Sequence, residues 1–254
     1  AVVMDVNTGA VLACATYPSY DLNTYYQNYE ALSKDKSSPL WNRALMSTYE
    51  PGSTMKPAIA AAGLEEGVIT ETSKFYCSHI YRQFTDTTFK CLGSHGWIDV
   101  KNALNQSCNI YFYETGRLLG INRMNDYCTR FGLGQKTGVE INESSGVLAG
   151  IAYREAHGGT WYPGDTVQAA IGQSDNLFTP IQLCSYVSTI ANGGTRYRAH
   201  FVKSVKSSDY SETLLSNDGV VLNETGVSQN SIRIVKEGME MLGARLPAFK
   251  SLPV

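Results

Sequence analysis

Tyr49-Glu50-Pro51-Gly52-Ser53-Thr54-Met55-Lys56-Pro57 is the stretch that decides the fold of this chain. Its Pro51-Gly52 pair predicts a turn, and the apolar run that follows, closed by Gly67, predicts a buried helix. Ser53 would then lie at a helix N-terminus, where unpaired backbone N–H groups favour an oxyanion. Lys56, three residues further on, lies on the same helical face. The spacing predicts a nucleophilic serine with a lysine beside it as proton acceptor.

The spacing S-x-x-K is weak evidence by itself. Ser33-Lys34-Asp35-Lys36 has the same spacing, in a polar, charged segment that predicts a loop with no helix behind it. For Ser53 and Lys56 the simple alternative is a helix cap followed by a solvated lysine. A lysine packed against an apolar helix loses its proton more readily than a solvated one, as a serine-activating base must. The rest of the sequence has to decide between these interpretations.

The composition predicts one folded domain. The chain has 254 residues, of which 43% are hydrophobic, and this is enough for a substantial core. A formal net charge of −2 gives no sign of a nucleic-acid partner or of affinity for an anionic membrane surface. Residues 1–6 and 249–254 look like strands that are cut short, so we expect residues 1–254 to be a fragment of a longer protein. The absence of a membrane span or a signal peptide then says nothing about where the protein resides.

Hydrophobic periodicity predicts strands at both ends of the chain and helices between them. Residues 1–16 alternate around an Asn/Gly turn and predict a β-hairpin, and residues 74–91 predict a second hairpin. This order favours an α+β fold over a parallel α/β sheet. The remaining predictions are loops and short helices over 17–48, helices that begin at Asp99 and that cover 110–119, 124–131, 179–191 and 231–242, loops over 132–138 and 163–173, and strands with turns over 202–225.

A series of motifs is spread along nearly the whole chain. They are Ala1–Ala13, the serine stretch 49–57, His95-Gly96, Ser107-Cys108-Asn109, Phe131-Gly132-Leu133-Gly134 with Thr137-Gly138, Pro163-Gly164-Asp165-Thr166, Ile171-Gly172-Gln173, Thr179-Pro180-Ile181-Gln182 and Glu237-Gly238-Met239. Together they resemble the transpeptidase domain of class B penicillin-binding proteins of the elongation type, which are relatives of the serine β-lactamases. The resemblance implies a β-lactamase/transpeptidase-like fold, in which an antiparallel sheet is flanked by helices and a second lobe is all-helical.

The resemblance also implies an activity, partners and a location. The activity is that of a serine D,D-transpeptidase, which cross-links peptidoglycan stem peptides through an acyl-enzyme on Ser53 and is acylated by β-lactams. The partners are the polymer made from the lipid-linked precursor and a membrane-embedded glycosyltransferase, and no nucleic acid is expected. The location is the extracytoplasmic face of the bacterial cell membrane, with an anchoring helix upstream of Ala1.

Such enzymes share a second motif, S-x-N, and three places match it. They are Ser107-Cys108-Asn109, Ser174-Asp175-Asn176 and Ser228-Gln229-Asn230. The first lies between two predicted helices, in the order and context that the family shows, so we assign the motif there. By resemblance, Ser107 relays a proton to and from the leaving amine, and Asn109 holds the amide of the substrate peptide.

The third shared motif, K-T-G, is spelled by Lys136-Thr137-Gly138. These residues follow the Phe131-Gly132-Leu133-Gly134 loop, whereas in the family the catalytic K-T-G lies on a strand well after the Glu237-Gly238-Met239 helix. We therefore expect Lys136 to be a surface lysine of a structural loop. The catalytic motif, and with it half of the oxyanion hole, is expected beyond Val254.

Four possible metal ligands fall within a short segment: Cys77, Cys91, His95 and Cys108. Three thiolates and one imidazole suit tetrahedral structural zinc. Cys77 and Cys91 flank the second predicted hairpin, so they can face each other. His79 is a competing nitrogen ligand, and Asp86 lies too near the hairpin turn. Some elongation-type members carry zinc at the corresponding positions, with aspartates where this chain has cysteines. The metal would brace the loop that carries the second motif.

Two other states of these cysteines remain open. A Cys77–Cys91 disulfide suits an extracytoplasmic domain, with His95 as a packed histidine, but it leaves the sulfur of Cys108 unused. Buried free thiols are the other alternative. The three further cysteines fall in apolar or helical patterns and are expected to be buried free thiols: Cys14, Cys128 and Cys184.

Three rival functions share this fold. A β-lactamase needs a deacylating base, and the Glu-x-x-Leu-Asn loop of the class A enzymes is absent from the sequence. A β-lactam sensor domain uses the same serine, although the motifs at 163–166 and 171–173 favour the synthase. The third rival is a catalytically silent scaffold in a cell-wall complex. The lack of a catalytic K-T-G after the Glu237-Gly238-Met239 helix within residues 1–254 supports it.

Overall fold

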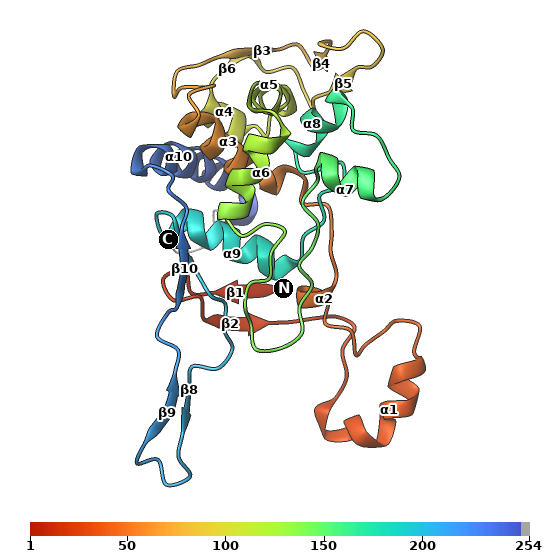
Figure 1. Ribbon diagram of the computed structural model, residues 1–254, viewed down its shortest axis with the longest axis vertical. Helices are drawn as coiled ribbons and strands as arrows, with labels where there is room; N and C mark the ends of the chain where they lie inside the picture. The colour runs from red at the N-terminus through yellow and green to blue at the C-terminus, as the bar shows by residue number, and fades with distance from the viewer. Residues whose placement is uncertain (250–254) are drawn as a thin grey trace.

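The computed structural model describes residues 1–249 (Figure 1). Most helices lie in one part of the molecule, and the strands β1, β2 and β10 lie below most of them in this view. The strand start predicted over 249–254 and the third motif expected beyond Val254 lie outside the described residues. The described part mixes helices with antiparallel strand pairs, which confirms the predicted α+β class.

Helix α3, Lys56–Glu65, is the centre of the helical part. Its alanine-rich sequence is apolar on every side, and such a helix is stable only when other elements surround it. Every residue from Lys56 to Gly63 is buried, and the helix packs against α5, α6 and α10. The helices around it are α4 (Val100–Asn105), α5 (Asn109–Leu119), α6 (Ile121–Arg130), α8 (Pro163–Ala169) and α10 (Gln229–Arg245).

Helix α9, Pro180–Ala191, joins the helical part to the strands. Its start is fixed by a capping box, in which Thr179 and Gln182 satisfy each other's backbone N–H groups. The helix packs against α2, β1, β7 and α10. The strand pairs here are β1 (Val2–Met4) with β2 (Val11–Cys14), and β7 (Thr195–Tyr197) with β10 (Val221–Glu224).

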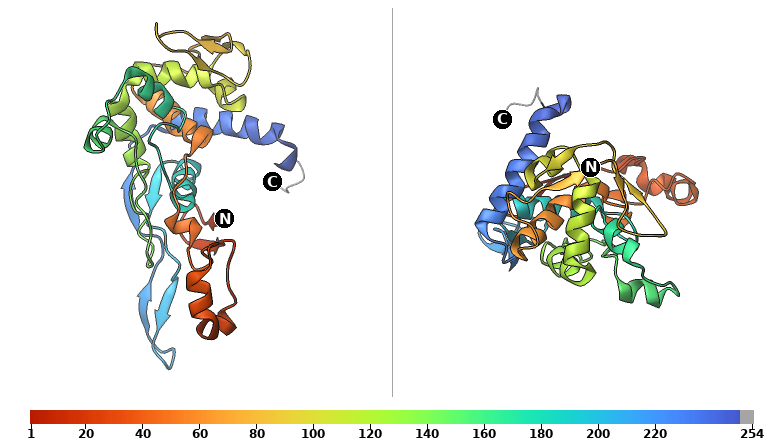
Figure 2. Two further views of the ribbon diagram at one scale, coloured as in Figure 1. Left: turned by 90° about the vertical axis from the view of Figure 1, so that its right-hand side faces the viewer. Right: turned by 90° about the horizontal axis from the view of Figure 1, so that it is seen from above.

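Two elements extend away from the body of the molecule (Figure 2). One is the helix α1, Tyr25–Lys34, which has no buried residue. The other is the hairpin of β8, Ser204–Lys206, and β9, Thr213–Ser216, whose residues are all exposed. The remaining short elements are η1 (Leu22–Thr24), α2 (Arg43–Met46), η2 (Gly52–Met55), α7 (Ile151–Ala156) and η3 (Pro247–Phe249).

The segment predicted as a second hairpin pairs differently. Strand β4, Ile80–Tyr81, pairs with β5, Phe89–Lys90, while β3, Phe75–Cys77, pairs with the later strand β6, Gly96–Ile98. The predicted hairpin is thus confirmed for β4 and β5, which pair across the turn, but it is wrong for β3. Strand β3 pairs with β6, which lies beyond the alternating residues 74–91.

Several helices begin and end where the sequence predicts. The side chain of Asp99 caps α4, α5 ends at Gly120, and α3 is followed by Gly67 with φ +65°. The loop predicted over 163–173 is wrong, because α8 occupies its first part. Pro163 stands at the first turn of that helix, where proline needs no N–H partner, and Asp165 accepts from the backbone N–H of Tyr162.

Candidate active site

Ser53 lies on the turn of 3₁₀-helix η2 that leads directly into α3. Its side chain is exposed, whereas Lys56, the first residue of α3, is only 2% exposed. The lysine is buried because α3 is covered on all sides. Its ammonium group also lies 5.6 Å from the centroid of the Phe112 ring. The S-x-x-K stretch thus carries an exposed hydroxyl and, three residues later, a buried amine.

Ser107 lies in the sharp connection between α4 and α5. Its φ is +52°, which is unusual for a residue other than glycine and is typical of strained functional sites. The connection is closed by hydrogen bonds from Ser107 N–H to the Leu104 carbonyl and from Cys108 N–H to the Ala103 carbonyl. This conformation turns both the hydroxyl and the carbonyl oxygen of Ser107 toward the buried lysine.

The four predicted catalytic residues come together in one hydrogen-bonded chain. Lys56 Nζ lies 2.8 Å from the Ser107 carbonyl oxygen, 3.0 Å from Ser107 Oγ and 2.7 Å from Asn109 Oδ1. Ser107 Oγ donates to Ser53 Oγ at 2.9 Å. Within residues 1–249, Ser53 Oγ is not among the hydrogen-bond partners of Lys56. The lysine therefore reaches the nucleophile through Ser107, rather than by the direct contact that the spacing predicts.

Burial of the Lys56 amine decides what fraction of it is protonated. It lowers the pKa of Lys56 from its ordinary value of 10.5 to about 8, while the charges of Cys91 and Cys108 act in the opposite direction. Near neutral pH a useful fraction of the lysine is therefore the free amine, which can accept a proton. This supports the interpretation of Lys56 as a base over that of a solvated lysine.

A cleft of ≈ 430 Å³ opens beside these residues. One side carries Ser53, Lys56 and Ser107, and the other is an apolar wall from the end of α10. Such a cleft, apolar with a few convergent polar groups, is typical of a binding site for a small or extended ligand. The α10 residues that line it are Met239, Leu242 and Gly243, and Leu246, directly after the helix, lines it as well.

The alternative matches to the motifs lie elsewhere. Ser33 is in the last turn of α1, rather than in the predicted loop, and Lys36, the lysine of this S-x-x-K match, is exposed in the turn after the helix. Ser174 accepts a hydrogen bond from Arg154. Ser228 caps α10.

The K-T-G sequence of this chain is held as a structural loop. Glu143, which is buried, accepts from the N–H and the hydroxyl of Thr137 and from the N–H of Gly138. Lys136 itself is exposed, as predicted. Neither Lys136 nor Thr137 is among the residues that line the cleft.

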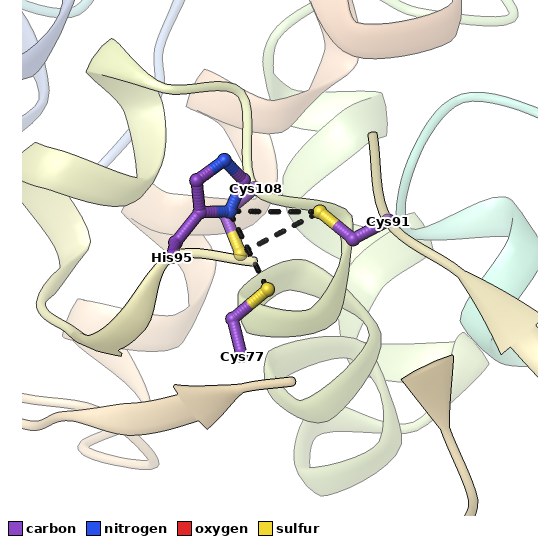
Figure 3. Close-up of side chains that lie close together, drawn as sticks. All are labelled: Cys77, Cys91, His95 and Cys108. Atoms are coloured by element: carbon purple, nitrogen blue, oxygen red, sulfur yellow. Dashed lines mark hydrogen bonds between the residues drawn. The ribbon is translucent and has the colours of Figure 1, made fainter. Parts of the chain in front are cut away.

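The sulfur atoms of Cys77, Cys91 and Cys108 and a ring nitrogen of His95 converge (Figure 3). The ligand atoms of Cys77, Cys91, His95 and Cys108 all lie within 4.8 Å of one another. His95 Nδ1 lies 3.4 Å from the sulfur of Cys77 and 3.7 Å from that of Cys91, and the sulfurs of Cys91 and Cys108 are 3.9 Å apart. The cluster includes His95 and not the competing His79, and Asp86 is exposed on the β4–β5 connection.

The spacing of these atoms fits a tetrahedral zinc site. Zn–S bonds of about 2.3 Å and Zn–N bonds of about 2.0–2.1 Å place two ligand sulfurs about 3.8 Å apart, and a sulfur and a nitrogen about 3.6 Å apart. The Cys77–His95, Cys91–His95 and Cys91–Cys108 separations agree with these values to within a few tenths of an ångström, and the remaining pairs lie within 4.8 Å. The hydrogen bond between Cys91 and Cys108 lowers the pKa of Cys91 and raises that of Cys108, so without a metal Cys91 is the thiolate of this pair and Cys108 the thiol.

All six cysteines are free thiols in the structure, so the Cys77–Cys91 disulfide is not formed. Cys128 is buried, as predicted for it, whereas Cys14 and Cys184 are only partly buried. Cys91 has a further contact that the sequence did not reveal, since its sulfur accepts from the backbone N–H of Asn109 at 3.2 Å. In the sequence, only the position of Cys108 inside the second motif links the cysteines to Asn109.

The sequence model of the family described as "Penicillin binding protein transpeptidase domain" matches residues 1–244. The chain belongs to this family. The match includes all four residues of the hydrogen-bonded chain at Ser53 and all four members of the cysteine–histidine cluster. Both groups therefore lie inside the transpeptidase domain rather than in an added segment.

Relatives and solved structures agree with this assignment. The peptidoglycan D,D-transpeptidase MrdA of Salmonella typhimurium (strain SL1344) is 34% identical over 218 residues, which are 81% of this chain and 34% of MrdA. A structure described as "Structural coordination of polymerization and crosslinking by a peptidoglycan synthase complex" is 31% identical with a TM-score of 0.85, and the match covers 100% of this chain and 44% of that one.

A third similar protein is penicillin-binding protein A from M. tuberculosis, in its penicillin G acyl-enzyme complex. It is 25% identical with a TM-score of 0.83, and the match covers 97% of this transpeptidase domain and 57% of that chain. The chain spans about a third of the length of the curated relative MrdA.

Across residues 1–249, no helix is both long and apolar enough to cross a membrane.

Proposed function

We propose that this domain is a serine D,D-transpeptidase that cross-links peptidoglycan stem peptides and is acylated by β-lactams. The observation that carries the proposal is the chain from Lys56 through Ser107 Oγ to Ser53 Oγ. It connects a buried amine with a lowered pKa to an exposed hydroxyl at the edge of a cleft. That is the arrangement an activated serine nucleophile needs.

The proposed reaction has two steps. In the first, the Ser53 hydroxyl passes its proton through Ser107 toward Lys56 and attacks the carbonyl carbon of the penultimate D-alanine. The amide bond to the terminal D-alanine breaks, and that amine leaves with the proton returned through Ser107. In the second step, an amine from a neighbouring stem peptide takes the acyl group and frees Ser53.

Asn109 is placed to serve both Lys56 and the substrate. Its Oδ1 accepts from Lys56, and its Nδ2 donates to the Lys90 carbonyl at 3.2 Å. The side chain is therefore fixed at both ends before substrate arrives. The proposed role is to hold the amide of the donor peptide next to Ser53, at low cost in reorganisation.

The first test is the intact mass of the full-length gene product with and without benzylpenicillin. A stable adduct of one penicillin is expected on the wild type and on a Ser174→Ala control, and no adduct on Ser53→Ala. An unmodified wild type would contradict the proposal and favour a silent scaffold. Release of hydrolysed penicillin with multiple turnovers would favour a β-lactamase instead.

A sensor domain of the same fold would also form a stable adduct, so a second assay is needed. The full-length protein is incubated with a polymer that carries pentapeptide stems, and the products are digested and analysed by mass spectrometry. Cross-linked dimers and free D-alanine are expected. Acylation by penicillin without any cross-linking would favour the sensor.

The partners and the location belong to the proposal as well. We propose that the whole protein resides at the extracytoplasmic face of the bacterial membrane, held by an N-terminal helix, in an elongation-type complex with a membrane-embedded glycosyltransferase. The similarity to a subunit of a complex that coordinates polymerization and crosslinking supports this. Co-purification from detergent-solubilised membranes with a polymerase, lost when the N-terminal segment is deleted, tests it.

We propose further that Cys77, Cys91, His95 and Cys108 hold one structural zinc ion. The donor set, the burial of the three thiols and the tetrahedral spacing support this. When bound, the metal supplies no chemistry to the reaction and braces the connection between α4 and α5. The test is metal analysis of the purified protein, in which one equivalent of zinc is expected and is lost in Cys108→Ala.

A further inference from the structure

The turn that carries Ser53 is held by the segment 172–178. Tyr49, just before the turn, exchanges two backbone hydrogen bonds of 2.9 Å with Phe178. The N–H of Gly52 donates to the carbonyl of Gly172, also at 2.9 Å. Three hydrogen bonds thus join the nucleophile's turn to a segment that is far away in the sequence.

Gly52 and Gly172 approach each other so closely that one of the two residues cannot carry a side chain. Both residues have positive φ, +54° for Gly52 and +74° for Gly172. A Cβ added to Gly172 would lie 2.2 Å from the carbonyl oxygen of Gly52 and 2.7 Å from its nitrogen. A Cβ added to Gly52 would meet nothing within 4 Å. Gly172 is therefore the residue that has to be glycine for this contact to form.

The segment 172–178 is itself firmly anchored. Asn176 is fully buried, accepts from the Ala149 N–H at 3.0 Å, and donates to the carbonyls of Ala169 and Gln173. Its neighbour Asp175 forms a 2.6 Å ion pair with Arg154. Because this side of the contact is fixed, a group inserted at Gly172 would displace Gly52 and, with it, the next residue, Ser53.

We propose that Gly172 is a positioning residue for the nucleophile. Because it has no side chain, its carbonyl can reach the N–H of Gly52, and this fixes the backbone at Ser53. The position of Ser53 in turn sets the 2.9 Å contact between Ser53 Oγ and Ser107 Oγ, on which proton transfer depends. Gly172 touches no substrate and acts only through Gly52. The inference rests on the proposed acyl transfer at Ser53.

The variant Gly172→Ala tests the proposal. Its Cβ and the Gly52 carbonyl oxygen have to separate by about 1.2 Å to reach ordinary contact at 3.4 Å. A displacement of about 1 Å in a reacting group costs on the order of 100-fold in rate. We expect the acylation rate constant with benzylpenicillin, measured by stopped flow on the full-length protein, to fall about 100-fold. The dissociation constant of the preceding non-covalent complex should stay within about twofold, because the apolar wall of the cleft lies away from Gly52 and is unchanged.

Gly158→Ala is the matched control. Gly158 has φ +77°, almost the same as Gly172, but a Cβ there would meet nothing within 4 Å. The control therefore has the same backbone strain without the displaced neighbour. It should lose a similar amount of thermal stability from that strain and acylate at the wild-type rate.

The outcomes separate this inference from the proposed function. If the wild type forms no adduct, the proposed function fails, and the inference fails with it. If the wild type is acylated and folded Gly172→Ala has the same acylation rate constant, the inference alone is overturned. Equal slowing in Gly172→Ala and Gly158→Ala would also overturn it, because strain and not the contact would then be the cause.

A second variant serves if Gly172→Ala does not fold. Arg154→Gln removes the ion pairs with Asp175 and Asp165 and the hydrogen bond to Ser174, and the shorter side chain adds no steric clash. Hydrogen exchange of the peptide that contains Gly52 reports directly on the N–H bonded to Gly172. Faster exchange there, together with slower acylation and an unchanged dissociation constant, is expected. Faster exchange with wild-type acylation would overturn the proposal.

Discussion

The amine of Lys56 donates to the hydroxyl of Ser107 at 3.0 Å, and that hydroxyl is directed at Ser53. The serine of the second motif therefore stands between the base and the nucleophile. This makes Ser107 the point at which a proton can move in either direction, toward Lys56 during attack and toward the leaving amine afterwards.

Removal of the Ser107 hydroxyl should therefore slow acylation strongly. General acid–base groups contribute about 10²–10⁴-fold, so Ser107→Ala should lower the acylation rate constant with benzylpenicillin by at least about 100-fold. Ser33→Ala, a change of the exposed serine in the last turn of α1, should leave it unchanged. Wild-type acylation by Ser107→Ala would mean that Lys56 acts on Ser53 directly.

The acylation rate should rise with pH through the pKa of Lys56. The free amine is the active form, and with a pKa of about 8 its fraction grows from about a tenth at pH 7 to about nine tenths at pH 9. We expect an increase of about tenfold over this range and a plateau above it. Lys56→Arg, which stays protonated, should be slow and show no such rise. A flat wild-type profile would argue against Lys56 as the base.

The K-T-G sequence at 136–138 should be irrelevant to the chemistry. Because Lys136 is exposed, Lys136→Ala should acylate within about twofold of the wild type. Glu143→Ala, in contrast, leaves the buried Thr137 without its acceptor and should lower the free energy of unfolding by about 2–3 kcal/mol. Urea unfolding and penicillin acylation of the two variants check both statements. Loss of acylation in folded Lys136→Ala would restore this motif as catalytic.

Chelation of the proposed zinc should reduce both stability and acylation. A ligand whose loss removes about 3 kcal/mol of stability lowers the melting temperature of a domain of this size by about 6–12 °C. Acylation should slow as well, because Cys91 holds the backbone N–H of Asn109. Differential scanning fluorimetry with a strong chelator, followed by zinc repletion, measures both effects. Cys128→Ser, a change outside the cluster, should respond to the chelator as the wild type does.

Oxidation should release the same metal. The sulfurs of Cys91 and Cys108 are 3.9 Å apart, so diamide can accept two electrons and two protons from this pair and leave a disulfide. Liberated zinc, read with a chromogenic chelator, should accompany a mass loss of about 2 Da in that pair of peptides. Cys91→Asp keeps an oxygen ligand for zinc and should resist diamide. Release of zinc from that variant at the wild-type rate would exclude the Cys91–Cys108 pair as the target.

Much of the catalytic centre could be predicted because the sequence patterns that indicate it are local. The turn and apolar run at 51–67 predict where Ser53 lies, and the cap at Asp99 predicts the connection that carries Ser107. The order in which the proton moves could not be predicted, since it depends on the positive φ of Ser107, which sequence does not reveal. The short spacing between Ser53 and Lys56 suggested a direct contact instead.

The errors in the predicted fold arise where a segment could adopt more than one local structure or pair with more than one strand. Strand β3 has two possible antiparallel partners, and the alternation of residues 74–91 does not show that β6 is preferred to β5. Helix α8 was missed because Pro163 and Gly164 are common in turns, and only the capping contact of Asp165 distinguishes a helix start. The contact of Gly52 with Gly172 joins distant segments, and no local pattern reports it.

The cysteine–histidine cluster also bears on the order in which the chain folds. All four residues lie between Cys77 and Cys108, so bringing them together closes only short loops and costs little chain entropy. The apolar wall of the cleft comes from α10, Gln229–Arg245, which packs on α3 and α4 only after a much longer loop is closed. We expect the connection with Ser107 and Asn109 to be shaped early, around the metal, and the substrate cleft to be completed only when α10 docks.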